Sequence, residues 1–157
     1  MKQTDNFKFD EANVMNELVY RNLSEDAKRQ ICAWKYGGEY DLYNLPSYEE
    51  MQVRQIGFMN PKSEKNYYGF WDESILVGFV NILEEKEEVF IGIGVNPDLC
   101  NKHYGQRMLL ITYEISKKLY PNKPLYLEVR TWNIRAVKCY QKAGFRIDGQ
   151  AYELTTG

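Results

Sequence analysis

The sequence predicts a single α/β domain in which helices cover both faces of a mostly antiparallel sheet. Two observations lead to this prediction. Three short β-rich runs, residues 67–71, 76–83 and 89–95, follow one another with only polar turns between them, which is typical of antiparallel strands. Segments with the helical spacing of apolar residues precede and follow these runs. A chain of 157 residues suits one domain with a core of its own.

The front of the chain is predicted to hold an arm, a strand and a helix. Residues 1–15 are polar and aperiodic, so we expect a mobile N-terminal arm. Residues 17–23 contain β-formers, and Ser24 then offers an N-cap for a helix whose apolar face continues to Trp34. The glycine pair at 37–38 ends this helix.

A tyrosine-rich loop separates this helix from a second one. Pro46 interrupts the loop, and Ser47 with Glu50 forms an S-x-x-E capping box. The second helix is expected to reach about Gly57 before the three strands begin.

Helices and strands alternate in the second half of the chain. A helical stripe starts near Tyr104, and Pro121 ends it. Residues 125–131 are predicted as a strand, after which Asn133 can cap a short helix. Gly144 stands where a left-handed residue is needed before the chain becomes extended again.

Composition argues against several classes of protein. The formal net charge is −2 and the pI about 5.6, with Lys and Arg spread along the chain, so no basic patch for nucleic acid is present. Cys32, Cys100 and Cys139 lie far apart, which indicates free thiols in a reducing compartment. No apolar run approaches the roughly 18 residues of a membrane span. We therefore expect a soluble, cytoplasmic protein without a membrane partner.

The strongest local signal for a binding site is residues 91–106, where a strand, Pro97 and a loop lead into a helix with Gly105 in its first turn. Backbone N–H groups at a helix start lack partners and lie at the positive end of the helix dipole, so they can bind phosphate. Taken alone, however, the segment fits better as an ordinary β-to-α connection.

Together with residues 125–145, LYLEVRTWNIRAVKCYQKAGF, this segment resembles the GNAT superfamily of N-acetyltransferases, and the front of the chain looks like its bacterial branch. The superfamily pattern is V-x-P, then Q/R-x-x-G-x-G/A, then L-x-V, N, A, Y and GF. The matching residues are Val95, Pro97, Gly105, Leu127, Val129, Asn133, Ala136, Tyr140, Gly144 and Phe145. The resemblance covers residues 67–145 well. It implies an α/β GNAT fold, with a mostly antiparallel mixed sheet split at its middle by the cofactor.

The resemblance also implies acetyl-CoA as the acyl donor. In this superfamily the pantetheine arm pairs with an exposed strand edge, which indicates Gly94 and Val95, and the pyrophosphate lies on the helix start. No metal site is expected. The cofactor-binding residues implied for this chain are Ile93, Gly94, Val95, Cys100, Asn101, Lys102, His103, Tyr104, Gly105, Gln106, Asn133, Ala136 and Tyr140.

The loop departs from the superfamily pattern at two positions. Cys100 stands where Gln or Arg usually begins the motif, and His103 replaces its first glycine. A residue at a helix start can keep right-handed geometry without being glycine, so we expect binding to survive. His103 is interpreted either as a tolerated surface residue or as a hydrogen-bond donor to phosphate.

Acetyl transfer to an amine needs a base for the amine and an acid for the departing thiolate. Glu128 is the candidate base, by a spacing from Tyr140 that resembles the branch acetylating protein N-termini; an ordinary surface glutamate is the alternative. Glu88 is the reserve candidate. Tyr140 matches the tyrosine that GNAT enzymes place near the thioester sulfur, and is the candidate acid. Cys139 is interpreted as a buried apolar residue rather than a nucleophile.

Aromatic residues gather in the segment that forms one wall of the acceptor site in this superfamily. The predicted acceptor-binding residues are Trp34, Tyr36, Tyr40 and Tyr43, and Tyr48 follows them. Aromatic faces beside acidic residues suit a cationic amine, although a packed aromatic loop fits equally well. A small-molecule amine acetyltransferase is favoured. A protein N-terminal or lysine acetyltransferase and a non-catalytic acyl-CoA-binding module are the alternatives.

The C-terminal segment is short for this superfamily, whose domains usually close with two strands. Residues 145–154 provide one strand, so the edge at 125–131 is expected to lack a neighbour. A homodimer or a longer natural chain would cover that edge. A small hairpin turning at Asp148 and Gly149 is the alternative.

Overall fold

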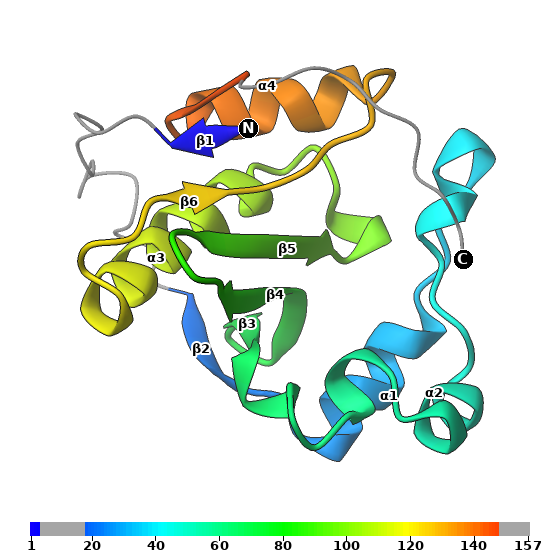
Figure 1. Cartoon of the computed structure of the whole chain (residues 1–157). Coiled ribbons are helices and arrows are strands. Elements are labelled where there is room, and N and C mark those ends of the chain that lie inside the picture. The colour runs from blue at the N-terminus through cyan, green and yellow to red at the C-terminus, as the bar shows by residue number, and fades with distance from the viewer. Residues whose placement is uncertain (4–17, 148–157) are drawn as a thin grey trace.

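A computed structural model describes residues 1–3 and 18–147 (Figure 1). The strands are β1 (Lys2–Gln3), β2 (Val19–Asn22), β3 (Tyr67–Asp72), β4 (Ile75–Glu84), β5 (Val89–Val95), β6 (Leu125–Tyr126) and β7 (Phe145–Arg146). The α-helices are α1 (Glu25–Ala33), α2 (Tyr48–Arg54), α3 (Tyr104–Leu119) and α4 (Ile134–Lys142). Short 3-10 helices are η2 (Gly38–Tyr43), η3 (Gly57–Met59), η4 (Glu64–Asn66) and η5 (Pro97–Leu99).

The strands form one mixed sheet in the order β2-β3-β4-β5-β6-β1-β7. Every neighbouring pair is antiparallel except β5 and β6, which run parallel. The α/β fold with a mostly antiparallel mixed sheet is thereby confirmed. The three central strands and helices α3 and α4 lie within a few residues of their predicted bounds, because each has a clear period and a capping residue.

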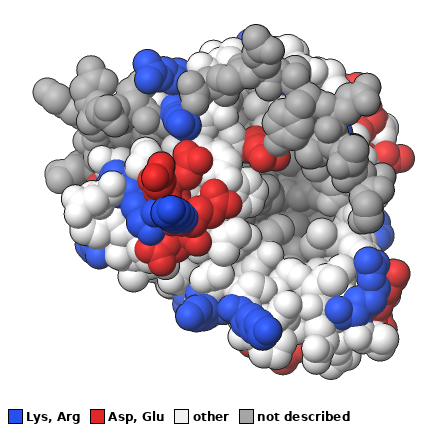
Figure 2. All heavy atoms as spheres, viewed as in Figure 1, with Lys and Arg blue, Asp and Glu red and all other residues white. Residues whose placement is uncertain are grey.

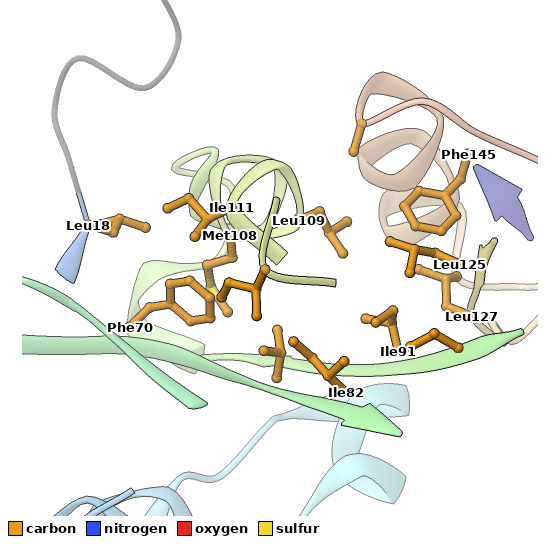
Figure 3. Packing of buried hydrophobic residues seen from close by; sticks show 14 of the residues in the cluster. Leu18, Phe70, Ile82, Ile91, Met108, Leu109, Ile111, Leu125, Leu127 and Phe145 are labelled. Carbon is orange, nitrogen blue, oxygen red and sulfur yellow. The ribbon is translucent and has the colours of Figure 1, made fainter. Parts of the chain in front are cut away.

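Two hydrophobic clusters cover the two faces of the sheet. Side chains of α3, such as Met108 and Ile111, pack against Phe70 and Ile82 on one face, as Figure 3 shows. On the other face, Ile31 of α1 and Met51 of α2 belong to the second cluster. Successive residues of a strand point to opposite faces, so β4 contributes side chains to both clusters, whereas the β5 residues of the core all belong to the first. Helices therefore lie on both faces, as predicted.

The helices begin at the capping residues that the sequence predicts. Ser24 accepts a hydrogen bond from the Ala27 amide at 3.1 Å, and Ser47 accepts one from Glu50 at 3.1 Å, so both begin their helices. Gly144 has a φ of 95°, the left-handed conformation that glycine adopts at little cost. The second helix ends earlier than expected, because Gln55 takes a left-handed conformation directly after Arg54.

The N-terminal residues occupy the sheet edge that was predicted to be open. Lys2 pairs with Tyr126 on one side and with Arg146 on the other, so β1 lies between β6 and β7. The Met1 ammonium donates to the Leu127 carbonyl at 2.5 Å, and the Leu127 amide donates to the Met1 carbonyl at 2.9 Å.

Two expectations are corrected by this strand. Residues 1–3 belong to the sheet rather than to a mobile arm, while residues 4–15 lie outside the described residues. The unpaired edge that suggested a second copy is covered by the chain itself, so it gives no support to a homodimer. The possible hairpin at Asp148 and Gly149 also lies outside the described residues. Among the described helices, none has the length and apolar character needed to cross a membrane.

Candidate active site

The edge of β5 is paired along only part of its length on the side facing β6. β5 pairs with β4 from Val89 to Val95, but with β6 only at Val89 and Phe90. The predicted strand at 125–131 therefore ends early as a sheet strand, because the chain leaves β5 after Tyr126. From residue 91 to 95 the β5 backbone has no strand partner on that side within the described part of the chain. An extended molecule can hydrogen-bond such an edge like an added strand.

Three elements meet where this edge ends. A Cβ atom built on Gly105 would lie 3.2 Å from the Cys139 Sγ and 3.5 Å from a Val95 methyl carbon. Gly105 therefore allows the first turn of α3 to approach α4 and β5 closely. The sequence interpretation gave this glycine a phosphate-binding role, and the structure adds a packing reason for it.

The loop before α3 contains two left-handed residues that are not glycine. Asn101 has a φ of 68°, and His103 has φ 66° and ψ 10°. The expectation that His103 keeps right-handed geometry is wrong. Asn and His enter the left-handed region more readily than most residues, although the conformation still costs about 1–2 kcal/mol relative to the right-handed one. The glycine that the resemblance leads one to expect at position 103 would adopt this conformation without strain.

This geometry makes His103→Val a test of the loop. A β-branched residue is poorly tolerated at positive φ, so His103→Val should lower the free energy of unfolding by about 1–2 kcal/mol, measured by urea denaturation. His103→Gly should stay within about 0.5 kcal/mol of wild type, because relief of strain offsets the greater freedom of the unfolded chain. Lys102→Val, whose φ is ordinary, is the matched control. Equal losses of unfolding free energy in the two valine variants would contradict a left-handed backbone at His103.

A cavity of about 320 Å³ lies beside the start of α3. It is lined by His103, Gln106, Arg107 and Leu110. The Gln106 side chain also donates to the Lys142 carbonyl at the end of α4, at 3.4 Å. The cavity thus combines a helix start with a basic side chain, and both attract phosphate. Arg107 was not among the binding residues predicted from the sequence, although a basic residue one turn into this helix could have indicated phosphate binding.

Not every residue of the predicted phosphate loop points its side chain at this cavity. The Tyr104 hydroxyl donates to an Asp72 carboxylate oxygen at 2.6 Å, and this bond raises the pKa of Tyr104. Cys100 lies after η5, and burial raises the pKa of its thiol. Lys102 is exposed. For Tyr104, the backbone is therefore the part available to a ligand.

The start of α4 is tied to η2. The Asn133 Oδ1 accepts from the Ala136 amide at 3.1 Å, which confirms the predicted cap, and its Nδ2 donates to the Tyr43 hydroxyl at 3.2 Å. Tyr140 follows one turn after Ala136 and packs against the main core. Burial, and then the nearby Cys139 and Tyr43, raise the pKa of Tyr140. Its phenol is therefore protonated at neutral pH and able to donate a proton.

The segment after α1 reaches the end of β5. The Tyr36 hydroxyl donates to the Val95 carbonyl at 2.5 Å, and the Asn44 side chain accepts from the Tyr36 amide at 2.6 Å. Burial raises the pKa of Tyr36, so this hydroxyl stays a donor. Figure 2 shows that the face is hollowed beside the C-terminal end of β5, and that the described residues around the hollow are mostly uncharged.

An aromatic cluster stands between η2 and the start of α4. The Tyr40 ring lies 5.5 Å from Trp132, the Tyr43 ring lies 6.2 Å from it, and the Arg135 guanidinium lies 4.4 Å from the Tyr40 ring centre. Trp132 and Arg135 were missed by the sequence interpretation, since only the fold brings them to the tyrosine loop.

The two remaining aromatic candidates differ, because Trp34 lies beside β5 and Tyr48 packs between helices. Trp34 lies 6.2 Å from Phe79, whose ring covers Gly94 so closely that a Cβ on this glycine would clash with it. Trp34 thus belongs to the wall beside β5. Tyr48 does not, because its hydroxyl bonds the Glu25 carboxylate and it packs between α1 and α2.

The two candidate bases are separated by the fold. Glu128 comes two residues after Tyr126, the last residue of β6, in the segment that has left β5. It is exposed. Glu88 precedes the opposite end of β5, about 20 Å from Val95, and forms an ion pair with Lys2 at 3.7 Å. Glu88 is therefore not brought to the site.

Cys139 provides a test of whether a thiol takes part. Burial raises the pKa of Cys139, so the thiol is neutral at pH 7 and is a poor nucleophile. Cys139→Ser should leave the rate of acetyl transfer within about threefold of wild type, measured as CoA released from acetyl-CoA. A loss of two orders of magnitude, with acetyl-CoA binding retained, would indicate a covalent intermediate on sulfur.

Comparison with known proteins agrees with this arrangement. A sequence profile of the acetyltransferase (GNAT) family matches residues 28–145, well over half of the chain. The chain belongs to the GNAT acetyltransferase family. A search of curated proteins finds no significant match. GNAT acetyltransferases use acetyl-CoA as co-substrate, so membership implies this donor here.

Solved structures share the GNAT fold at low sequence identity. A chimera of the spermidine N-acetyltransferase SpeG from Vibrio cholerae and hSSAT is 20% identical, with a TM-score of 0.71, over 85% of this chain and 82% of that one. A GNAT acetyltransferase from Streptococcus pneumoniae is 24% identical, with a TM-score of 0.62, over 85% and 87%. One from Bacillus anthracis is 19% identical, with a TM-score of 0.67, over 84% and 81%.

Proposed function

We propose that this GNAT protein transfers the acetyl group of acetyl-CoA to a primary amine, preferably of a small molecule, by direct attack of the amine while both substrates are bound. The observation that carries the proposal is the partly paired edge of β5, which ends beside the start of α3 and Cys139 of α4. An extended pantetheine arm fits an unpaired edge, and a pyrophosphate fits a helix start with a nearby arginine.

Particular residues hold the donor in this proposal. The backbone of residues 93–95 pairs with the pantetheine arm, and the backbone of residues 101–106 binds the pyrophosphate at the cavity lined by His103 and Arg107. The Asn133 amide and Ala136 border the arm. When bound, acetyl-CoA supplies an acetyl group activated as a thioester.

The protein contributes proton transfer and orientation. Glu128 accepts a proton from the ammonium, directly or through water, because an amine with a pKa near 10.4 is mostly protonated at neutral pH. Tyr140 donates a proton to the leaving sulfur, and its raised pKa keeps that proton available. Tyr36, Tyr40, Tyr43 and Trp34 form the wall that faces the acceptor.

The small-molecule preference is supported by the aromatic cluster of Tyr40, Tyr43 and Trp132. The segment from Tyr36 to Tyr43 is bound to both β5 and α4, so it narrows the approach to the thioester end. A peptide chain would need a longer open groove.

The test is an acetyl-transfer assay with purified full-length protein. Acetyl-CoA is mixed with a panel of n-butylamine, spermidine, Nα-acetyl-lysine amide and a peptide with a free N-terminus, and free thiol is measured. Thiol release that depends on a small amine, with the acetylated amine found by mass spectrometry, is the expected result. Thermal stabilisation by acetyl-CoA without transfer to any amine would point instead to a non-catalytic binding module.

A further inference from the structure

The loop between β5 and α3 is fixed to the β3–β4 hairpin at both of its ends. At its start, the Asn96 amide donates to the Val77 carbonyl at 2.8 Å, and the Asn96 side chain donates to the Leu76 carbonyl at 3.1 Å. At its end, the Tyr104 hydroxyl donates to an Asp72 carboxylate oxygen at 2.6 Å. The loop is thus held between two anchors on one hairpin.

The second anchor matters because α3 begins without a cap of its own. Among the four α-helices in the described part of the chain, α1, α2 and α4 begin at a side chain that accepts a hydrogen bond from the helix, whereas the His103 side chain makes no such bond. His103 is also left-handed, which is unfavourable for a residue other than glycine. The position of the first turn therefore depends on contacts with other elements, and a hydrogen bond from Tyr104 to a carboxylate is a strong contact of this kind.

The same bond reaches a side chain of the phosphate cavity. Arg107 lies about one turn after Tyr104, and its guanidinium is 5.2 Å from the centre of the Tyr104 ring, within the range of a cation–π contact. Arg107 also lines the cavity of about 320 Å³ together with His103 and Gln106. A bond that holds the Tyr104 ring in place therefore also favours one position of the Arg107 guanidinium.

We propose that Asp72 is a positioning residue for donor binding. Its carboxylate holds Tyr104, and through Tyr104 it holds the first turn of α3 and the Arg107 side chain in the arrangement that binds the pyrophosphate of CoA. The inference rests on the proposed function, which assigns the pyrophosphate to this turn. Asp72 acts through Tyr104 and does not contact the donor.

The charge of Asp72 and its bond to Tyr104 have opposite expected effects on CoA binding. If the carboxylate acted only through its charge, Asp72→Ala would remove a charge that repels phosphate, and CoA would bind more tightly. Because the bond positions the turn, Asp72→Ala should instead raise the Kd for CoA about tenfold. Tyr104→Phe keeps both the charge and the ring but breaks the same bond, so it should raise the Kd by a similar factor. Calorimetry with CoA measures both values.

A double-mutant cycle shows whether the two residues act through one bond. The variant that combines Asp72→Ala with Tyr104→Phe should bind CoA about as weakly as either single variant, because each substitution breaks the same contact. Independent losses that multiply to about 100-fold in the double variant would overturn the proposal. An unchanged or lower Kd in either single variant would overturn it as well.

A second hydrogen bond between a tyrosine and a carboxylate provides the matched control. The Tyr126 hydroxyl donates to a Glu85 carboxylate oxygen at 2.7 Å, and Tyr126 pairs with Phe90 near the start of β5, away from α3. Tyr126→Phe should leave the Kd for CoA within about twofold of wild type. Tenfold weaker binding in Tyr126→Phe as well would show that loss of any such bond weakens CoA binding, and would overturn a particular role for Asp72.

A shortened donor separates positioning of the pyrophosphate from a general loss of structure. S-acetylpantetheine carries the same thioester but lacks the pyrophosphate and the nucleotide. Asp72→Ala should therefore lower kcat/KM about tenfold with acetyl-CoA, and less than about twofold with S-acetylpantetheine. Equal losses with the two donors would overturn the proposal.

The binding measurement also separates this proposal from the proposed function. Calorimetry with CoA needs no acceptor amine. If wild type binds CoA but acetylates no amine, the proposed transfer fails, and the comparison of Asp72→Ala, Tyr104→Phe and Tyr126→Phe still decides the role of Asp72. If wild type does not bind CoA, both proposals are overturned.

Discussion

Tyr140→Phe should lower kcat for acetyl transfer about 100-fold or more, with acetyl-CoA affinity changed by less than about threefold. The phenol is protonated because burial raises its pKa, and its proton is needed only as the thiolate leaves. The ring itself packs against the core and is kept by phenylalanine. Initial rates with saturating amine, together with calorimetry of acetyl-CoA binding, measure both quantities.

Tyr113→Phe is a matched control, because Tyr113 also packs against the same core but lies on α3. That variant should retain wild-type turnover. An unchanged kcat in Tyr140→Phe would remove Tyr140 from the mechanism. A large loss of acetyl-CoA affinity in the same variant would assign it to binding instead.

Glu128→Gln should lower kcat/KM for the amine about 100-fold at pH 7, and the loss should shrink as pH rises. The neutral fraction of an amine with a pKa near 10.4 grows about tenfold per pH unit below that value, so a base is needed less at high pH. Glutamine keeps the shape of the side chain but accepts no proton. Rates measured from pH 7 to 10 with one amine give the comparison.

Glu88→Gln is the control for this substitution, because Glu88 precedes the far end of β5. It should follow the wild-type pH profile. A loss in Glu128→Gln that is the same at every pH would indicate that Glu128 positions the amine rather than takes its proton.

Local sequence rules account for much of the fold and part of the site. The strands β3 to β5 and the caps at Ser24, Ser47 and Asn133 depend on residues close together in the chain, and the structure has them where the sequence indicates. The GNAT pattern likewise depends on ordered short motifs. Such features can be predicted from the sequence because residues close together in the chain determine them.

Contacts between distant segments account for what the sequence did not show. Lys2 and Gln3 form a strand by pairing with β6 and β7, which lie far from them in the sequence. Trp132 joins Tyr40 only through the fold. The left-handed backbone of His103 could not be predicted either, since a histidine can adopt the right-handed or the left-handed conformation.

The central claim is that the free edge of β5 and the start of α3 bind the CoA part of the donor. Hydrogen exchange of backbone amides, measured with and without CoA, tests this claim most directly. We predict slower exchange in residues 91–95 and 101–106 on addition of CoA, with little change in the β2–β3 pair on the far side of the sheet. Unchanged exchange in both segments at saturating CoA would contradict the claim.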